Sequence, residues 1–129
     1  MTARHALIVE DNRSNIQVLA TLLDQQSITS TGLADPTRLT DTLQELDHLD
    51  LVFLDLVMPY VNGYQVLEML RGLPEYAHLP VIAYSVYVSQ LEQAYAAGFD
   101  SFLAKPLDPV RFPGQIARIL NGEGVWERF

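Results

Sequence analysis

Residues 51–59, with the sequence LVFLDLVMP, constrain the fold of this chain more than any other stretch. Residues 51–54 are apolar without a polar break, which is typical of a strand buried on both faces of a parallel sheet. The strand is predicted to stop at Asp55, and Pro59 and Gly63 then indicate a loop and a new element. A carboxylate at the end of a buried strand is costly unless another group compensates its charge. Asp55 is therefore either a solvated helix-capping residue or part of a functional site.

Strand-like and helix-like stretches alternate along the whole chain. Strands are predicted at residues 6–9, 27–33, 51–54, 81–84 and 101–104. Helices are predicted after the N-cap Ser14, from Asp35-Pro36, after Gly63, at 91–97 before Gly98, and at 110–120. This alternation predicts an α/β fold: a doubly wound five-stranded parallel sheet with right-handed crossovers and helices on both faces. Binding sites in such sheets lie at the carboxyl ends of the strands, where the strand order reverses.

Composition restricts the classes of function. The 129 residues suit a single domain, and 49% hydrophobic with 19% charged residues indicate a globular chain. A net charge of −8 and a pI near 4.6 argue against nucleic-acid or anionic-membrane binding. The chain has no cysteine, no secretory signal in residues 1–5 and no apolar run long enough to span a bilayer. We therefore expect a small acidic domain of the cytoplasm.

Polar side chains follow four of the five predicted strands. Glu10 and Asp11 follow the first, Asp55 the third, Ser85 the fourth and Lys105 the fifth. Two carboxylates about 4 Å apart repel by about 4 kcal/mol at an effective dielectric constant near 20, so this cluster requires a cation. Oxygen ligands without histidine or cysteine favour Mg²⁺, or the similar Mn²⁺. The set is typical of a phosphoryl site in which Asp55 is the nucleophile, Lys105 neutralises the transferred group and Ser85 donates a hydrogen bond to it.

These residues lie in motifs that resemble the receiver domain of two-component response regulators (CheY-like). The motifs are VEDN at 9–12, LDLVMP at 54–59, Gly63, PVIAYS at 80–85 and AGFDSFLAKP at 97–106. The resemblance covers a core of about residues 5–121 and leaves a short tail at 122–129. It implies a flavodoxin-like fold with strand order 2-1-3-4-5. It also implies Mg²⁺-dependent phosphorylation of Asp55 by a histidine kinase or a histidine phosphotransfer protein.

The same resemblance assigns roles to individual residues. It implies that Asp11 and Asp55 bind the metal directly, Glu10 binds it through water, and Val57 contributes its backbone carbonyl. Lys105 would contact the phosphoryl group. Ser85 would move toward that group and Phe102 would turn inward, which changes a surface made by the fourth helix, fifth strand and fifth helix. The alternative for Phe102 is an ordinary half-buried aromatic residue of a strand.

Three residues depart from the family pattern. Val86 stands where alanine or glycine is usual, and we expect its larger side chain to narrow access to Asp55 and slow phosphotransfer from small donors. Tyr87 is also unusual and is expected to be an exposed loop residue, although it could lean over the site. Ser101 replaces the more common acid before the aromatic, and the sequence suggests no consequence.

The histidines and the tail carry weaker signals. His5, His48 and His78 have no ligand-like spacing and are predicted to lie on the surface. Trp126 and Phe129 follow a pair of glycines and are expected to dock on the domain or on a partner rather than be disordered.

The predicted function is that of a stand-alone receiver, a phospho-acceptor rather than an enzyme, that signals through a downstream protein. A receiver cut from a larger regulator or hybrid kinase is one alternative. An Mg²⁺-dependent phosphatase of the haloacid dehalogenase type is another, disfavoured because Val57 stands where that class has a second acid. A flavodoxin-like FMN carrier is disfavoured because no Ser/Thr/Gly-rich phosphate loop follows the first predicted strand. A degenerate receiver that acts only as a scaffold is disfavoured because the set of acids is intact. The sequence identifies no cognate kinase, downstream target or oligomeric state.

Overall fold

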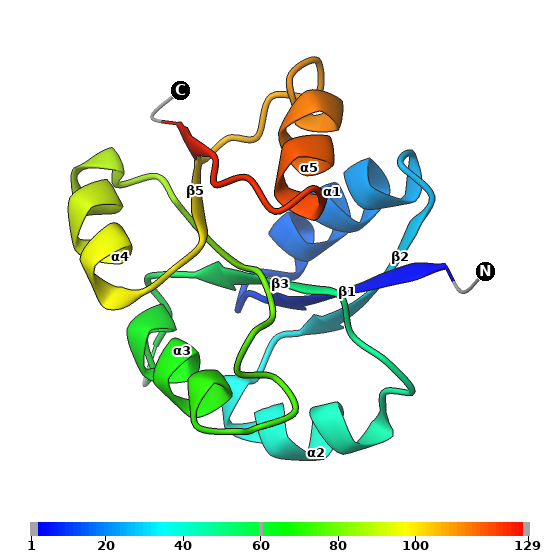
Figure 1. Ribbon diagram of the computed structural model, residues 1–129, viewed down its shortest axis with the longest axis vertical. Helices are drawn as coiled ribbons and strands as arrows, with labels where there is room; N and C mark the ends of the chain where they lie inside the picture. Colours follow the sequence, from blue (N-terminus) through cyan, green and yellow to red (C-terminus); the bar gives the residue numbers. More distant parts are fainter. Residues whose placement is uncertain (1–2, 60, 128–129) are drawn as a thin grey trace.

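The computed structural model describes residues 3–59 and 61–127. They form one sheet with helices on both faces (Figure 1). The strands are β1 (Arg4–Val9), β2 (Ile28–Leu33), β3 (Leu51–Asp55), β4 (Val81–Ser85), β5 (Ser101–Ala104) and β6 (Trp126–Glu127). The helices are α1 (Arg13–Asp24), α2 (Leu39–Glu45), α3 (Gly63–Arg71), α4 (Leu91–Ala97) and α5 (Phe112–Leu120). Two 3₁₀ turns, η1 (Pro36–Arg38) and η2 (Val88–Gln90), lead into α2 and α4.

All strand pairs are parallel, and the sheet order is β2-β1-β3-β4-β5-β6. The predicted doubly wound fold and the core order 2-1-3-4-5 are therefore confirmed. The predicted number of five strands is one too few, because Trp126–Glu127 adds a sixth strand beside β5. A strand of two residues is too short to carry a periodic pattern, so hydrophobic periodicity does not predict it.

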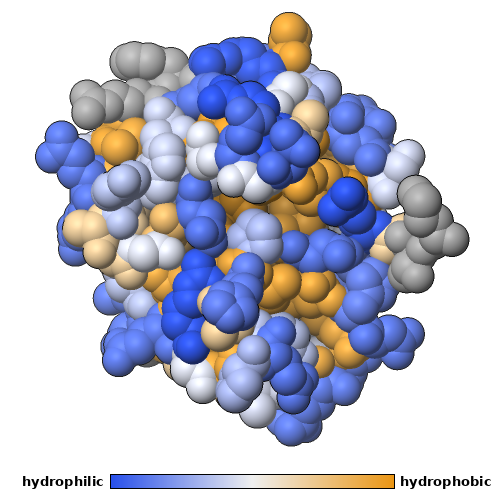
Figure 2. Space-filling model, viewed as in Figure 1, coloured by the Kyte–Doolittle hydropathy of each residue, from blue (hydrophilic) through white to orange (hydrophobic). Residues whose placement is uncertain are grey.

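The strands separate two hydrophobic cores, because successive side chains point to opposite faces of a sheet. In β1, Leu7 and Val9 join the core under α2, α3 and α4, whereas Ala6 and Ile8 join the core under α1 and α5. Figure 1 shows α1 and α5 on one side of the sheet and α2 and α3 on the other. Covering both faces explains why the central strands β3 and β4 are buried along their whole length. Figure 2 shows hydrophilic residues around most of the outline of one face, with hydrophobic residues visible mainly toward its centre.

The helix ends follow local capping chemistry. Asn12, not the predicted Ser14, caps α1, since its side chain accepts the Asn15 N–H. Asp35 caps η1 as its position before Pro36 suggests. Gly98 ends α4 at φ 103°, a left-handed conformation that favours glycine.

The surface positions predicted for the histidines are correct for two of them. His48 and His78 are exposed, but His5 is half-buried, and its Nδ1 and Nε2 each lie 2.7 Å from a threonine hydroxyl, of Thr29 and Thr31. Trp126 is docked as expected, while Phe129 lies outside the described residues. Within residues 3–59 and 61–127, no helix is long and apolar enough to cross a membrane.

Candidate functional site

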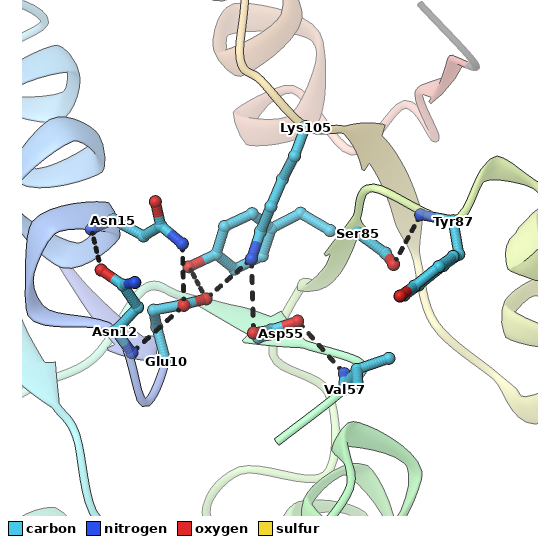
Figure 3. Close-up of polar contacts among 9 residues, drawn as sticks. Glu10, Asn12, Asn15, Asp55, Val57, Ser85, Tyr87 and Lys105 are labelled. Carbon is cyan, nitrogen blue, oxygen red and sulfur yellow. Dashed lines mark hydrogen bonds and ion pairs between the residues drawn. The ribbon is translucent and has the colours of Figure 1, made fainter. Parts of the chain in front are cut away.

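The strand order reverses between β1 and β3, because the chain goes from β1 outward to β2 and then crosses back to β3. At this edge the structure brings together the predicted acids, Glu10, Asp11 and Asp55, with one carboxylate oxygen of each within 4.8 Å of the others. Lys105, which follows β5, points into the same place (Figure 3). Residues separated by up to 95 positions in the chain thus form one cluster of charged side chains.

Lys105 bridges two of the carboxylates. Its Nζ lies 2.9 Å from Glu10 Oε2 and 3.3 Å from Asp55 Oδ2. The ammonium also lies 4.4 Å from the centre of the Tyr84 ring, a cation–π contact. Because the side chain of Lys105 is largely buried, its charge is screened little by solvent and compensates the acids directly.

Glu10 is the most enclosed of the acids, with 1% of its surface exposed. Its Oε1 accepts hydrogen bonds from Asn15 Nδ2 at 3.1 Å and from the Asn12 N–H at 3.3 Å (Figure 3). Burial acts to raise the pKa of Glu10, but its bonds with Asp55, Lys105 and Asn15 outweigh burial and hold that pKa below its usual range.

Asp55 is 5% exposed, and its pKa is shifted upward, opposite to that of Glu10. Burial, followed by its interaction with Glu10, raises the pKa of Asp55 to about 6, although the Val57 N–H and Lys105 partly offset both effects. The Val57 N–H donates to Asp55 Oδ1 at 3.1 Å.

Tyr84 belongs to the site although sequence reasoning placed it only in a strand. Its hydroxyl donates to Glu10 Oε2 at 2.9 Å, and the side chain is almost fully buried. A tyrosine in an otherwise apolar buried strand usually finds a partner for its hydroxyl, so its position one residue before Ser85 was an available signal.

The last residue of β4, Ser85, and the two residues that follow it border the site, and only the latter two are exposed. Ser85 is buried, and its Oγ accepts the Tyr87 N–H at 3.0 Å (Figure 3). Val86 and Tyr87 are 59% and 54% exposed, which agrees with the expected exposed tyrosine. Phe102, by contrast, is fully buried in the core under α4 and is not the half-buried residue of the alternative interpretation.

Gly63 allows α3 to begin against the end of β3. A Cβ atom at this position would lie 2.6 Å from the Asp55 carbonyl oxygen and 3.0 Å from Leu56 Cα. Both are backbone atoms that cannot move aside, so a larger residue would push the helix away from the strand that carries Asp55. The glycine of the sequence motif thus has a packing reason.

The donor set fits a hard divalent cation. Glu10, Asp11 and Asp55 offer only oxygen ligands, and among the described residues they are the one group of three or more acids, histidines or cysteines close enough to hold a metal ion. Asp11 is exposed, which leaves room for ligand water on the solvent side. The Val57 carbonyl oxygen remains a predicted ligand.

Comparison with known proteins gives a consistent family. Residues 6–117 match the model of the response regulator receiver domain. Protein RcaC of Microchaete diplosiphon is 34% identical over 122 residues, which are 93% of this chain and 19% of RcaC. The polar-differentiation response regulator DivK of Brucella ovis is 27% identical over 111 residues, 84% of this chain and 89% of DivK.

A solved structure supports the fold. The chemotaxis response regulator CheY4 of Vibrio cholerae superimposes with a TM-score of 0.81 at 22% identity, covering 92% of this chain and 99% of CheY4. The chain thus spans nearly all of some similar proteins, but only about a fifth of the length of RcaC.

Proposed function

Because the chain belongs to the response regulator receiver family, we propose that it is a signal receiver that accepts a phosphoryl group on Asp55. The donor is a phosphohistidine of a histidine kinase or of a histidine phosphotransfer protein. The observation that carries the proposal is the position of Asp55, held at the sheet edge between the ammonium of Lys105 and the N–H of Val57.

The reaction is a displacement at phosphorus. A carboxylate oxygen of Asp55 attacks, a P–O bond forms, and the P–N bond to the donor imidazole breaks. The imidazole keeps the electron pair of that bond and takes up a proton from solvent. Only the deprotonated carboxylate can attack, and a pKa of about 6 for Asp55 leaves most of it deprotonated at neutral pH.

Two side chains of this chain are suited to the charge that develops on the phosphoryl oxygens. Lys105 is already within 3.3 Å of Asp55 and can turn its ammonium toward the incoming group. The Ser85 oxygen accepts the Tyr87 N–H, so its own hydrogen remains available to donate to a phosphoryl oxygen. Ser85 and Lys105 are therefore proposed as phosphoryl-contacting residues.

The acids at this edge are suited to bind Mg²⁺, or Mn²⁺ in its place. Asp11 and Asp55 would bind it directly, Glu10 through water and Val57 through its carbonyl oxygen. The ion supplies positive charge beside the phosphoryl oxygens. The bonds from Tyr84 and Asn15 to Glu10 hold the most buried acid of this set in place.

We extend the proposal to a switch. Ser85 responds to the phosphoryl group, and Phe102 transmits the change to a surface made by α4, β5 and α5. Since Phe102 is already fully buried, its part is a change of neighbours in the core rather than a change of exposure.

The signal leaves through contact with a downstream protein in the cytoplasm, without an enzyme activity toward a separate substrate. The coverage of DivK supports a stand-alone receiver, whereas the coverage of RcaC supports the alternative, a receiver within a longer regulator. A phosphatase of the haloacid dehalogenase type is disfavoured, because two residues after Asp55 stands Val57 and not an acid.

Mass spectrometry of the intact chain tests the proposal. After incubation with acetyl phosphate and Mg²⁺, we expect one added phosphoryl group that hydroxylamine removes, as it does from an acyl phosphate. Asp55→Asn should abolish the adduct, while Asp35→Asn, at an exposed acid that caps η1, should retain it. An adduct that persists in the Asp55→Asn variant, or no adduct with either small or phosphohistidine donors, would contradict the proposal.

A further inference from the structure

The last described residues fold back onto the outer edge of the sheet. β6, close to the C-terminal end of the ribbon in Figure 1, lies beside β5 in parallel. Phe102 lies opposite Trp126, and Leu103 lies opposite Glu127. The Phe102 N–H donates to the Val125 carbonyl at 2.8 Å. Val125 itself is fully buried in the core under α1 and α5, so the segment is anchored before β6 begins.

Ser101 provides a second anchor. Its buried Oγ accepts the Val125 N–H at 3.0 Å. This is the position at which the chain departs from the acid usual in its family, and the structure now supplies a consequence for that departure. Gly124 is required as well, since a Cβ there would lie 3.0 Å from the Asp100 carbonyl oxygen.

The side chains of β6 contact the two helices that flank β5. The Trp126 ring packs edge-on against Tyr95 of α4, with ring centres 5.0 Å apart. The Glu127 carboxylate pairs with Arg111, which precedes α5, and accepts a bond from Gln115 Nε2 at 2.9 Å. Arg118 Nη1 lies 3.7 Å from the other oxygen of Glu127. A segment with an aromatic residue followed by an acid thus contacts α4, β5 and α5 at once.

β6 leaves some groups of the surface made by α4, β5 and α5 without a contact. Gln115 is only 7% exposed, and its side-chain oxygen Oε1 has no hydrogen-bond partner among the described residues. Tyr95 remains 67% exposed beside Trp126. Within the described part of the chain, β6 pairs with only two residues of β5. A longer segment with a hydrogen-bond donor near Gln115 could make contacts that β6 does not make.

We propose that the edge of β5, flanked by Tyr95 on one side and by Arg111, Gln115 and Arg118 on the other, is a strand-addition surface. Its ligand is an extended segment of another protein that carries an aromatic residue followed by an acid and pairs parallel with β5. Residues 125–127 of this chain occupy the surface as an intramolecular competitor. The proposal rests on the α4, β5 and α5 surface of the proposed function and names the partner of that surface. The peptide assay below uses the unphosphorylated chain, so its failure is distinguishable from a failure of Asp55 to accept a phosphoryl group.

The tail of a second copy of this chain carries the same aromatic residue and acid, but competition from the tethered β6 argues against a second copy as the ligand. A tethered segment competes at an effective concentration of about millimolar, and the tail of a second copy would make the same contacts without any additional one. A separate protein that also satisfies Gln115 Oε1 has the advantage needed to displace β6.

The test uses the full chain and a fluorescein-labelled peptide with the sequence of residues 122–129. Glu127→Lys places a cation against Arg111 and Arg118, so we expect β6 to leave and the emission of Trp126, the one tryptophan of the sequence, to shift to the red. Fluorescence anisotropy should then show at least about tenfold tighter peptide binding to the Glu127→Lys chain than to wild type. Glu123→Lys, with the same charge change in the same segment, should behave as wild type.

Receptor and ligand specificity are tested in the same assay. A peptide with lysine in place of Glu127 should not bind, and Arg118→Ala in the Glu127→Lys background should weaken binding several-fold. If Glu127→Lys unfolds the chain, as judged by circular dichroism, Trp126→Ala removes the aromatic anchor and carries the same expectation. Equal affinity of the opened and wild-type chains, binding of the lysine peptide, or no binding overturns the proposal. A dimer of the wild-type chain at the same concentrations, seen by light scattering, assigns the surface to a second copy and overturns the choice of a separate protein.

Discussion

The hydroxyl of Tyr84 donates a 2.9 Å hydrogen bond to Glu10 Oε2, and both side chains are almost fully buried. The same Glu10 oxygen receives the ammonium of Lys105 at 2.9 Å. Tyr84 therefore fixes the carboxylate that holds Lys105 in place, and Lys105 in turn reaches Asp55. This chain of contacts links the middle of the sheet to the predicted phosphorylation site.

Tyr84→Phe should destabilise the chain by about 1–2 kcal/mol, less than a fully lost bond to a charged group, because Lys105 still pairs with Glu10. Mg²⁺ affinity should fall by about tenfold, as expected when a residue that orients a metal-site carboxylate is removed. Urea unfolding and Mg²⁺ titration measure the two effects. Tyr64→Phe, which loses a hydroxyl bond to Gln90 away from the acids, should leave Mg²⁺ affinity unchanged.

Asp55 should make stability depend on pH. Its pKa is raised from 3.8 to about 6 by folding, so between these pH values the folded state holds more protons than the unfolded chain. The contribution of protonated Asp55 is therefore present below about pH 4 and is lost as the pH rises to about 6. After allowance for solvent screening, we expect the free energy of unfolding to fall by on the order of 1–2 kcal/mol over this pH range.

Asp55→Asn removes this titration. In metal-free buffer the variant should be more stable than wild type above pH 7, and the difference should shrink toward pH 4. Denaturant unfolding at a series of pH values measures it. A difference that is constant across this range would argue against the raised pKa of Asp55.

Mg²⁺ should stabilise the folded chain through the acids at the sheet edge. At tenfold its dissociation constant, a ligand that binds only the folded state adds about 1.4 kcal/mol to the free energy of unfolding. Asp11→Asn should remove this gain, as followed by thermal unfolding with and without Mg²⁺. Asp41→Asn, which changes an acid in the first turn of α2, serves as the control and should keep the gain.

Val86 should limit access of small phosphodonors to Asp55. Its branched side chain is 59% exposed in the loop directly after Ser85. Val86→Ala should speed phosphorylation by acetyl phosphate by about threefold to tenfold, or about 1 kcal/mol of activation free energy. Val110→Ala shortens another exposed valine and should not change the rate. An unchanged rate in Val86→Ala would remove the steric explanation.

The sequence alone determined the sheet, because buried parallel strands must be apolar on both faces and must alternate with helices. It also determined that Glu10, Asp11, Asp55, Ser85 and Lys105 share one edge, since parallel strands end on the same side. The strand ends could be read from abrupt changes from apolar to polar residues. Capping was less accurate, because Asn12 and Ser14 are both good N-caps and only the backbone geometry distinguishes them.

Only the tertiary structure decided which groups pair within that edge. The partner of Tyr84 lies 74 residues away in the chain, and the pKa of Asp55 depends on burial and on Glu10 and Lys105, which follow two other strands. The same holds for β6, whose two residues have no pattern of their own and are held by Ser101, Tyr95 and α5. Local sequence fixes periodicity and turns, whereas hydrogen-bond partners and pKa values arise from contacts between segments that only folding brings together.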